Sequence, residues 1–402
     1  MIRLPQLACA ALPSLLLPIL ACDSQPSSTC PADPTAQPLW TVDDEFAIPQ
    51  QIALSGDGSL AVVAWDLNYQ RLSLHDTKDG TVLWSFDAAP LADPSSLYAI
   101  GFAGIDEPGT RIAATVANTL FAFAADDPTP VWSLALSDMS IGQAAMAATT
   151  GAVVLHVINT AGERLLLSID AAGQEQWRSP TIGTGAPLRS SLSVSADGAR
   201  VAAGADGDLY VIQDGQIVFQ DHSDTTSVTA ILSGDGETLV EAASLQVMLR
   251  QWNGDTYEQL WQYSYECEDG CLPPVLATND SGSLVAAGIG SFSTAALLVF
   301  DRQGAQPIYD SGDVLGLVTA IAIPADGCAI AVSSYGNQAG TLPHVVLYDR
   351  VGNKQYFEEA MPGSALQVAI SADGRRGLVS SRSTYATERS KGGAIFFFDT
   401  GS

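Results

Sequence analysis

A short hairpin signal recurs along this chain, and its repetition constrains the fold more than any other feature. The signal has the form apolar–Ser–x–Asp–Gly–x–apolar, and clear copies begin at Leu54, Val194, Leu232, Thr278, Ile323 and Ile370. Weaker copies begin at Ile105 (IDEPGTR) and Ala148 (ATTGAV), which makes eight. An Asp-Gly pair supplies the positive-φ residues that a tight β-hairpin needs. The pattern therefore predicts eight copies of one antiparallel unit.

A second repeated signal follows each hairpin and ends in an aromatic residue after a turn that usually contains glycine. The aromatic residues are Trp84, Trp132, Trp177, Phe219, Trp261, Tyr309 and Tyr356. The eighth is Trp40, because its context PLWTVDD matches the context VLWSFDA of Trp84. From Trp40 to Tyr356 there are 316 residues in seven intervals. The mean interval of about 45 residues is the length of a four-stranded propeller blade.

The last copy breaks off at FFFDTGS, before its outer strand. The strand around Trp40 is expected to supply that outer strand, which closes the ring and hides two sheet edges. The sequence thus predicts an all-β, eight-bladed β-propeller over residues 38–402, with the eight aromatic residues packed between blades. A seven-bladed ring is the alternative if the hairpin at Ala148 is not a repeat.

The signal Asp-x-x-Gly-x-x-x-Trp, as in DAAGQEQW ending at Trp177, resembles the quinoprotein-like repeat of eight-bladed propellers. The Ser-x-Asp-Gly hairpin resembles that of WD40-type repeats. The resemblance implies the architecture and little about activity, because propellers host many unrelated functions. Quinone-dependent alcohol dehydrogenases of this fold use adjacent cysteines and a bound calcium, and no two cysteines are adjacent here. We therefore expect no cofactor; a quinone is disfavoured, and calcium remains the alternative although no Asp-x-Asp-x-Asp ladder is present.

The N-terminus resembles a bacterial lipoprotein signal. Residues 1–21 join Arg3 to a short apolar run, and the sequence ILAC ending at Cys22 is similar to a lipobox, whose cysteine is lipidated. An ordinary cleaved signal peptide is the alternative. Residues 22–37 are rich in Pro, Ser and Thr, so a flexible tether is expected there. The prediction is a protein of the bacterial cell envelope, periplasmic or at the cell surface, with a lipid anchor on Cys22.

Four cysteines remain in the mature chain, an even number that favours disulfides in an oxidising compartment. Cys267 and Cys271 bracket Glu-Asp-Gly, a turn that brings them within bonding distance; a zinc site is the alternative. We letter the strands of a blade A (innermost) to D (outermost). The A–B and C–D turns then share one face of the ring, the A–B face, and the B–C and D–A turns share the other, the B–C face. Cys328 follows an A–B turn and Cys30 enters on the same face, so a Cys30–Cys328 disulfide is expected, worth about 4 kcal/mol.

The charge of the chain excludes some partners. Seventeen basic residues against 44 acidic ones give a net charge of −27. Such a chain lacks the cationic surface that nucleic acids and anionic bilayers attract. No Gly-x-Ser-x-Gly, His-Glu-x-x-His or phosphate-loop motif is present. The four histidines are expected to be structural: His75, His156, His222 and His344.

A local reversal of charge marks the one candidate surface. The B–C loop of the last blade, residues 380–393, contains three basic residues and a tyrosine. Tyr, Trp and Arg are favoured at interface hot spots, so we predict a recognition patch on the B–C face of blades seven, eight and one. A mobile, solvated loop is the alternative. The candidate partner-binding residues are Arg382, Tyr385, Arg389, Tyr335, Asn337 and Tyr69, with Trp65 and Asn68 beside them.

Together these features predict a monomeric, non-enzymatic, lipid-anchored propeller of the envelope that scaffolds proteins or binds a small ligand. Among envelope propellers, the lipoprotein that assists outer-membrane barrel assembly is similar in lipobox, blade number and repeat. One alternative is a hydrolase, lyase or oxidoreductase with a site at the ring axis. Another is a passive surface protein that its charge keeps soluble.

Overall fold

The chain is an all-β ring, as the repeats predict. The computed structural model describes residues 30, 36–67, 70–91, 100–185, 190–205, 207–224, 228–243, 245–266, 271–291, 294–312, 315–337, 339, 341–350, 355–359, 361–384 and 392–400. Across these ranges the one helical element is a single 3-10 turn, Ala89–Leu91. No helix in them is long and apolar enough to cross a membrane.

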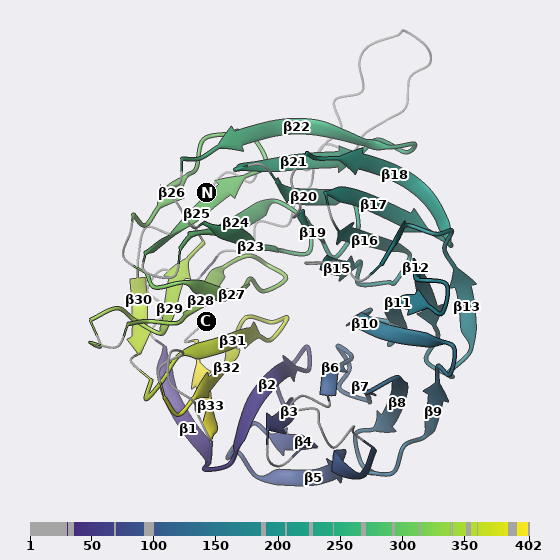
Figure 1. Ribbon diagram of the computed structural model, residues 1–402. Helices are drawn as coiled ribbons and strands as arrows, with labels where there is room; N and C mark the ends of the chain where they lie inside the picture. Colours follow the sequence, from purple (N-terminus) through teal and green to yellow (C-terminus); the bar gives the residue numbers. More distant parts are fainter. Residues whose placement is uncertain are drawn as a thin grey trace, which may run out of the picture.

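The strands form eight antiparallel sheets that stand around a central axis (Figure 1). Blade 1 comprises β2 (Ala47–Leu54), β3 (Leu60–Leu67), β4 (Arg71–Asp76) and β5 (Val82–Asp87). Blade 2 comprises β6 (Ile100–Ile105), β7 (Arg111–Val116), β8 (Thr119–Ala124) and β9 (Trp132–Ala135). Blade 3 comprises β10 (Met139–Met146), β11 (Val153–Asn159), β12 (Glu163–Ile169), β13 (Glu175–Arg178) and the short β14 (Gly183–Thr184). Blade 4 comprises β15 (Ser190–Val194), β16 (Arg200–Ala205), β17 (Asp208–Gln213) and β18 (Gln216–His222).

The second half of the ring repeats the same order of strands. Blade 5 comprises β19 (Thr229–Leu232), β20 (Thr238–Ala243), β21 (Gln246–Trp252) and β22 (Tyr257–Ser264). Blade 6 comprises β23 (Leu272–Thr278), β24 (Leu284–Gly290), β25 (Ala295–Asp301) and β26 (Tyr309–Asp310). Blade 7 comprises β27 (Val318–Ala322), β28 (Ala329–Ser334), β29 (Val345–Asp349) and β30 (Gln355–Glu359). Blade 8 comprises β31 (Ala365–Ile370), β32 (Arg376–Arg382), β33 (Gly393–Asp399) and, from the other end of the chain, β1 (Gln37–Asp44).

The A–B turns explain why the hairpin signal recurs. In blade 1 the Ser55 hydroxyl donates a hydrogen bond to the Asp57 carboxylate at 2.7 Å and accepts one from the Leu60 amide at 3.0 Å. Each of the eight A–B turns holds a glycine with positive φ: Gly58, Gly109, Gly151, Gly198, Gly236, Gly282, Gly327 and Gly374. Glycine adopts this backbone conformation without the steric cost that other residues meet. The weak copy at Ala148 is therefore a true repeat, and the seven-bladed alternative is wrong.

Neighbouring A–B turns are joined by a closed belt of hydrogen bonds. An N–H group of each A–B turn donates a hydrogen bond to a carbonyl of the next blade. The Gly56 amide donates to the Glu107 carbonyl at 2.8 Å, and the Glu107 amide donates to the Ala148 carbonyl at 2.7 Å. The remaining donor–acceptor pairs are Thr149–Ala196, Ala196–Gly234, Asp235–Asp280, Asn279–Ala325, Ala325–Ala372 and Asp373–Gly56. All eight blade junctions take part, so the belt ties the inner rim of the A–B face together.

The ring is closed by strands from opposite ends of the chain. Strand β1 pairs antiparallel with β33, and Trp40 lies opposite Phe397. The two rings stack with centroids 4.9 Å apart, and Phe397 is fully buried. The Trp40 indole also donates to the Thr77 carbonyl of blade 1 at 2.7 Å. The predicted closure is thus confirmed, and one side chain links blades 8 and 1.

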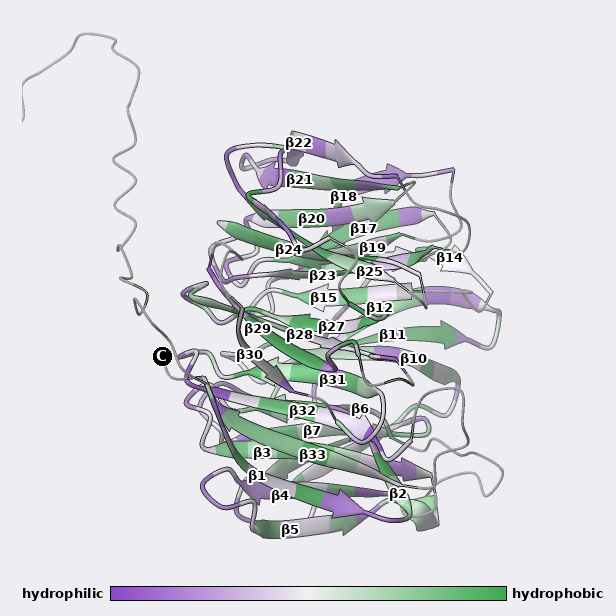
Figure 2. Ribbon diagram, turned by 90° about the vertical axis from the view of Figure 1, so that its left-hand side faces the viewer, coloured by the Kyte–Doolittle hydropathy of each residue, from purple (hydrophilic) through white to green (hydrophobic). Residues whose placement is uncertain are grey.

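The repeated aromatic residues whose side chains the structure describes pack between blades, as expected; the side chain of Tyr356 lies outside that description. The indoles of Trp84 and Trp132 donate to carbonyls of the following blade, at 2.9 Å and 3.0 Å. The ring of Trp132 lies so close to Gly173 of blade 3 that a side chain at this glycine would clash. Further round the ring, Trp261 packs on Phe300 with centroids 5.1 Å apart. Figure 2 shows the resulting pattern, with apolar stretches inside the strands and hydrophilic residues at their ends.

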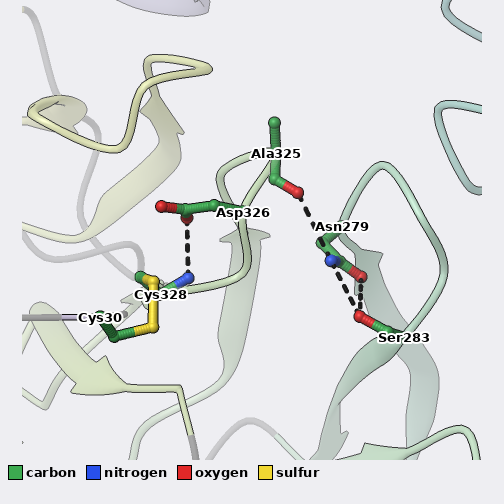
Figure 3. The surroundings of a disulfide bond; sticks show 6 residues. All are labelled: Cys30, Asn279, Ser283, Ala325, Asp326 and Cys328. Carbon is green, nitrogen blue, oxygen red and sulfur yellow. Dashed lines mark hydrogen bonds between the residues drawn. A yellow bond between two sulfur atoms is a disulfide. The ribbon is translucent and has the colours of Figure 1, made fainter. Parts of the chain in front are cut away.

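The structure contains the predicted disulfide between Cys30 and Cys328, with Cα atoms 5.3 Å apart (Figure 3). Cys328 directly follows the A–B turn of blade 7, and its amide donates to the Asp326 carboxylate at 2.9 Å. Cys271 is disulfide-bonded as well. Its predicted partner Cys267 lies outside the described residues, so that pairing stays a prediction.

Candidate interaction site at the ring axis

A pocket of about 510 Å³ opens at the ring axis on the B–C face. It is formed where the innermost strands of blades 5 to 8 begin, together with the end of strand B of blade 7. Its apolar lining includes Leu272, Pro273, Pro274, Leu317, Tyr335 and Leu366. Hydroxyl groups of Thr229 and Thr319 also contribute to the wall. The described lining residues include no carboxylate, imidazole or thiol side chain.

The local sequence explains the shape of the pocket wall in blade 6. Strand β23 begins Leu272-Pro273-Pro274, and its register against β24 shifts between Leu272 and Val275. Proline has no backbone N–H, so it is tolerated at the first residues of a strand and at bulges. The two prolines therefore leave the strand start irregular and place apolar rings at the pocket.

The junction of blades 7 and 8 links two predicted patch residues through Ser364, and one of them, Tyr335, lines this pocket. The Ser364 hydroxyl donates to the Tyr335 carbonyl at 3.2 Å, and the Ser364 carbonyl accepts from the Arg382 amide at 3.0 Å. Tyr335 lines the pocket, and Arg382 begins the loop that carries the reversed charge. The Arg382 side chain is half-buried, and its Nε has no hydrogen-bond partner in the part of the chain that the structure describes. Ser364 thus connects Tyr335 with Arg382, and no sequence motif marks this serine.

Asn337 forms hydrogen bonds within its own loop. Its side-chain carbonyl accepts from the Thr341 amide at 2.8 Å, and its side-chain amide donates to the Thr341 hydroxyl at 2.7 Å. Nearby, His344 is buried, accepts from the Met361 amide at 3.1 Å and packs so tightly on Gly336 that a side chain there would clash. Burial lowers the pKa of His344. These residues fix the loop beside Tyr335.

The remaining patch residues divide into two groups. Tyr385, Arg389 and Tyr69 lie outside the described residues, as does Asn68. Trp65 is described, and the expectation that it contributes to a surface patch is wrong. It is fully buried, and its indole donates to the Ser73 hydroxyl at 2.8 Å, which in turn bonds His75. Trp65 therefore belongs to a polar chain inside blade 1.

A buried ion network joins blades 4 and 5 on the B–C face. The Glu241 carboxylate is buried within strand β20 and accepts from Arg250 Nε at 3.1 Å. Arg250 also pairs with Asp221 of blade 4. Burial raises the pKa of Glu241, and the charge of Arg250 acts in the opposite direction. The single acid in the apolar run LVEAA was the signal that could have identified this network from the sequence.

Three of the four histidines, His75, His156 and His222, lie in strands, and His344 directly precedes strand β29. His75 bonds the Ser73 hydroxyl at 2.8 Å and the Gly80 carbonyl at 3.1 Å, and His222 pairs with the Asp208 carboxylate at 2.8 Å. His156 is 2% exposed, and neither ring nitrogen has a hydrogen-bond partner within the described ranges. The same part of the chain holds no group of three or more His, Cys, Asp or Glu side chains that could bind a metal ion.

His156 predicts a specific loss of stability in acid. Burial, assisted by the charge of Arg164, lowers the pKa of His156 from 6.5 to about 4. Between these values the unfolded chain binds a proton that the folded chain does not, so stability is complete above pH 6.5 and falls towards pH 4. Between pH 7 and pH 5, we expect the unfolding free energy of the native protein to fall by about 2 kcal/mol more than that of the His156→Leu variant. Urea unfolding at both pH values measures this, and an equal loss in the two proteins would contradict it.

Comparisons with known proteins support the architecture. The family described as outer membrane protein assembly factor BamB matches residues 68–233, from blade 1 to the first strand of blade 5. Among solved structures, the β-propeller domain of Cps50 (Swd1) from Myceliophteria thermophila is similar with a TM-score of 0.54 and 11% identity, over 90% of this chain and 99% of that one. At this identity the likeness shows the fold alone. No curated protein matches. The chain is thus a β-propeller, of which residues 68–233 are similar to the BamB family.

Proposed function

We propose that this β-propeller is a lipid-anchored scaffold of the bacterial cell envelope that binds protein partners at its axial pocket. The proposal includes a signal peptide over residues 1–21, lipidation of Cys22, a tether over residues 22–37 and a monomeric ring. The match to the BamB family supports an assembly or interaction role near the outer membrane. A rigid ring with an open pocket is a platform on which a partner can dock without a change in the fold.

The observation that carries the proposal is the axial pocket, in which Tyr335 and Leu366 meet at the junction of blades 7 and 8. Tyrosine is among the residues enriched at the hot spots of protein interfaces. The partner that this chemistry fits is an extended segment that places an apolar side chain in the pocket.

Substitution of pocket residues tests the proposal. We expect the Tyr335→Ala, Leu366→Ala double variant to recover at least about tenfold less of its envelope partners from solubilised membranes. Stability should change little, because both side chains are only partly buried. Leu260→Ala is the matched control, since Leu260 is 48% exposed on the outer strand β22. Equal recovery by the two variants, quantified by mass spectrometry, would refute the pocket as the docking site.

A further inference from the structure

The disulfide fixes which face of the ring is turned towards the membrane. Cys328 lies on the A–B face, whereas the axial pocket opens on the B–C face. We propose that the Cys30–Cys328 disulfide holds the A–B face next to the bilayer, so that the pocket face points away from it and is open to soluble partners. This inference rests on the lipid anchor of the proposed function.

The length of the chain between the lipid and the disulfide sets the reach of the anchor. Eight residue steps separate Cys22 from Cys30, and an extended chain spans at most about 28 Å over eight steps. Without the disulfide, the first fixed point is Gln37 in strand β1, fifteen steps from Cys22 and about 50 Å at full extension. The disulfide therefore shortens the usable tether by nearly half.

The dimensions of a blade show why this difference matters. The outer strand β1 of blade 8 has eight residues and is about 25 Å long, so a path along it from one face to the other covers about that distance. Cys328 precedes strand B, and two strand spacings of about 5 Å separate strand B from the outer strand D. A tether that left Cys30 and passed round the outer edge to the opposite face would need roughly 35 Å. The disulfide-bonded tether is too short for that path, whereas a tether fixed only at Gln37 is long enough.

The anchor point of the disulfide is itself held rigidly. Figure 3 shows the Cys328 amide bonded to Asp326 of the same turn, and the Ala325 carbonyl accepting from the Asn279 side chain of blade 6 at 3.4 Å. The Ala325 amide donates to the Ala372 carbonyl of blade 8 at 3.3 Å. The disulfide thus attaches the tether to the hydrogen-bonded belt and not to a loose loop. A movement of the anchor is transmitted to the ring as a whole.

The orientation defines the kind of partner that the pocket can meet. A partner has to reach a surface at least about 25 Å above the bilayer, which is one blade height. A soluble protein, or a soluble domain of a membrane protein, meets this requirement. A segment buried in the bilayer does not.

Two matched reporter positions on blade 3 test the orientation. Ala172 lies in the C–D turn and Ala161 in the B–C turn; both are exposed and at opposite ends of strand β12. Each backbone amide bonds the side chain of the residue two positions earlier, a contact that a cysteine leaves in place. Lipidated full-length Ala172→Cys and Ala161→Cys proteins are labelled with a donor dye and bound to phosphatidylethanolamine–phosphatidylglycerol vesicles that carry an acceptor dye on the lipid headgroup.

We expect energy transfer from position 172 to be at least twofold that from position 161. A spacer of twelve Gly/Ser residues inserted between Cys22 and Cys30 leaves the disulfide intact and is expected to abolish the difference. Equal transfer in the native tether, or greater transfer from position 161, would overturn the orientation while leaving the scaffold function intact. Protein that fails to float with the vesicles would refute the lipid anchor of the proposed function, and the orientation with it.

Discussion

The Cys30→Ser, Cys328→Ser double variant is expected to lose about 4 kcal/mol of unfolding free energy. The disulfide joins residues 298 positions apart, so it removes a large share of the conformational freedom of the unfolded chain. It also fixes the N-terminal segment just before strand β1, which closes the ring. Chemical denaturation of the oxidised native protein and the double variant measures the difference.

The second cysteine pair provides the control for this result. If Cys267 and Cys271 are bonded, they close a loop of only three residues between them. In the chain-entropy model, the stabilisation grows with the logarithm of loop length. The Cys267→Ser, Cys271→Ser variant is therefore expected to lose clearly less stability than the Cys30–Cys328 variant. A change below about 1 kcal/mol in the latter would show that the long-range disulfide does not stabilise the ring.

Truncation of Phe397 is expected to produce a loss of similar size at the ring closure. Phe397 is fully buried in strand β33 and stacks on Trp40 of the closing strand β1. A buried Phe→Ala change removes the transfer free energy of the ring and leaves a cavity, which together cost about 3–5 kcal/mol. We therefore expect Phe397→Ala to lower the unfolding free energy by about 4 kcal/mol, measured by denaturant titration.

A double-mutant cycle shows whether this loss belongs to the closure. Stacked aromatic pairs contribute about 1 kcal/mol beyond the apolar area that they bury. The loss of unfolding free energy in the Trp40→Ala, Phe397→Ala double variant should therefore be smaller, by about that amount, than the sum of the losses in the two single variants. Phe300→Ala is the matched control. Phe300 is equally buried and packs on Trp261 of the preceding blade, so this pair does not join the two ends of the chain. Strict additivity of Trp40→Ala with Phe397→Ala would mean that the closing strand contributes no coupling through this pair.

The architecture followed from the sequence because each blade repeats two local signals. The positive-φ glycine of the A–B turn and the aromatic residue between blades are set by neighbours a few residues away, and both recur in the chain. The closure also followed, because Trp40 has the same local context as Trp84 although it lies in the first blade-forming strand. Only the weak copy at Ala148 left the blade number open, and Gly151 of that turn has the same positive φ as the others.

The candidate site was only partly predictable from the sequence. The axial pocket combines strand starts from four blades, and no local pattern marks Leu317 and Leu366 of adjacent blades as parts of one pocket. Trp65 was misplaced because it was grouped with Asn68 and Tyr69 of the following loop, whereas strand β3 continues to Leu67. Residues 61–66 of strand β3 are all buried, since strands inside a blade are covered on both faces by adjacent blades. The position of Tyr335 next to Arg382 depends on Ser364, a contact between two blades.

Cross-linking of the lipidated protein in its own membranes, followed by identification of the captured proteins, tests the central claim most directly. Cys22→Ala is the control for the anchor, and the Tyr335→Ala, Leu366→Ala variant is the control for the pocket. We predict that the native protein captures a stoichiometric envelope partner, that the pocket substitutions reduce its capture, and that the loss of the anchor abolishes it. Absence of any stoichiometric partner, or capture that is unchanged by the pocket substitutions, would contradict the claim that this propeller is an envelope scaffold that binds proteins at its axis.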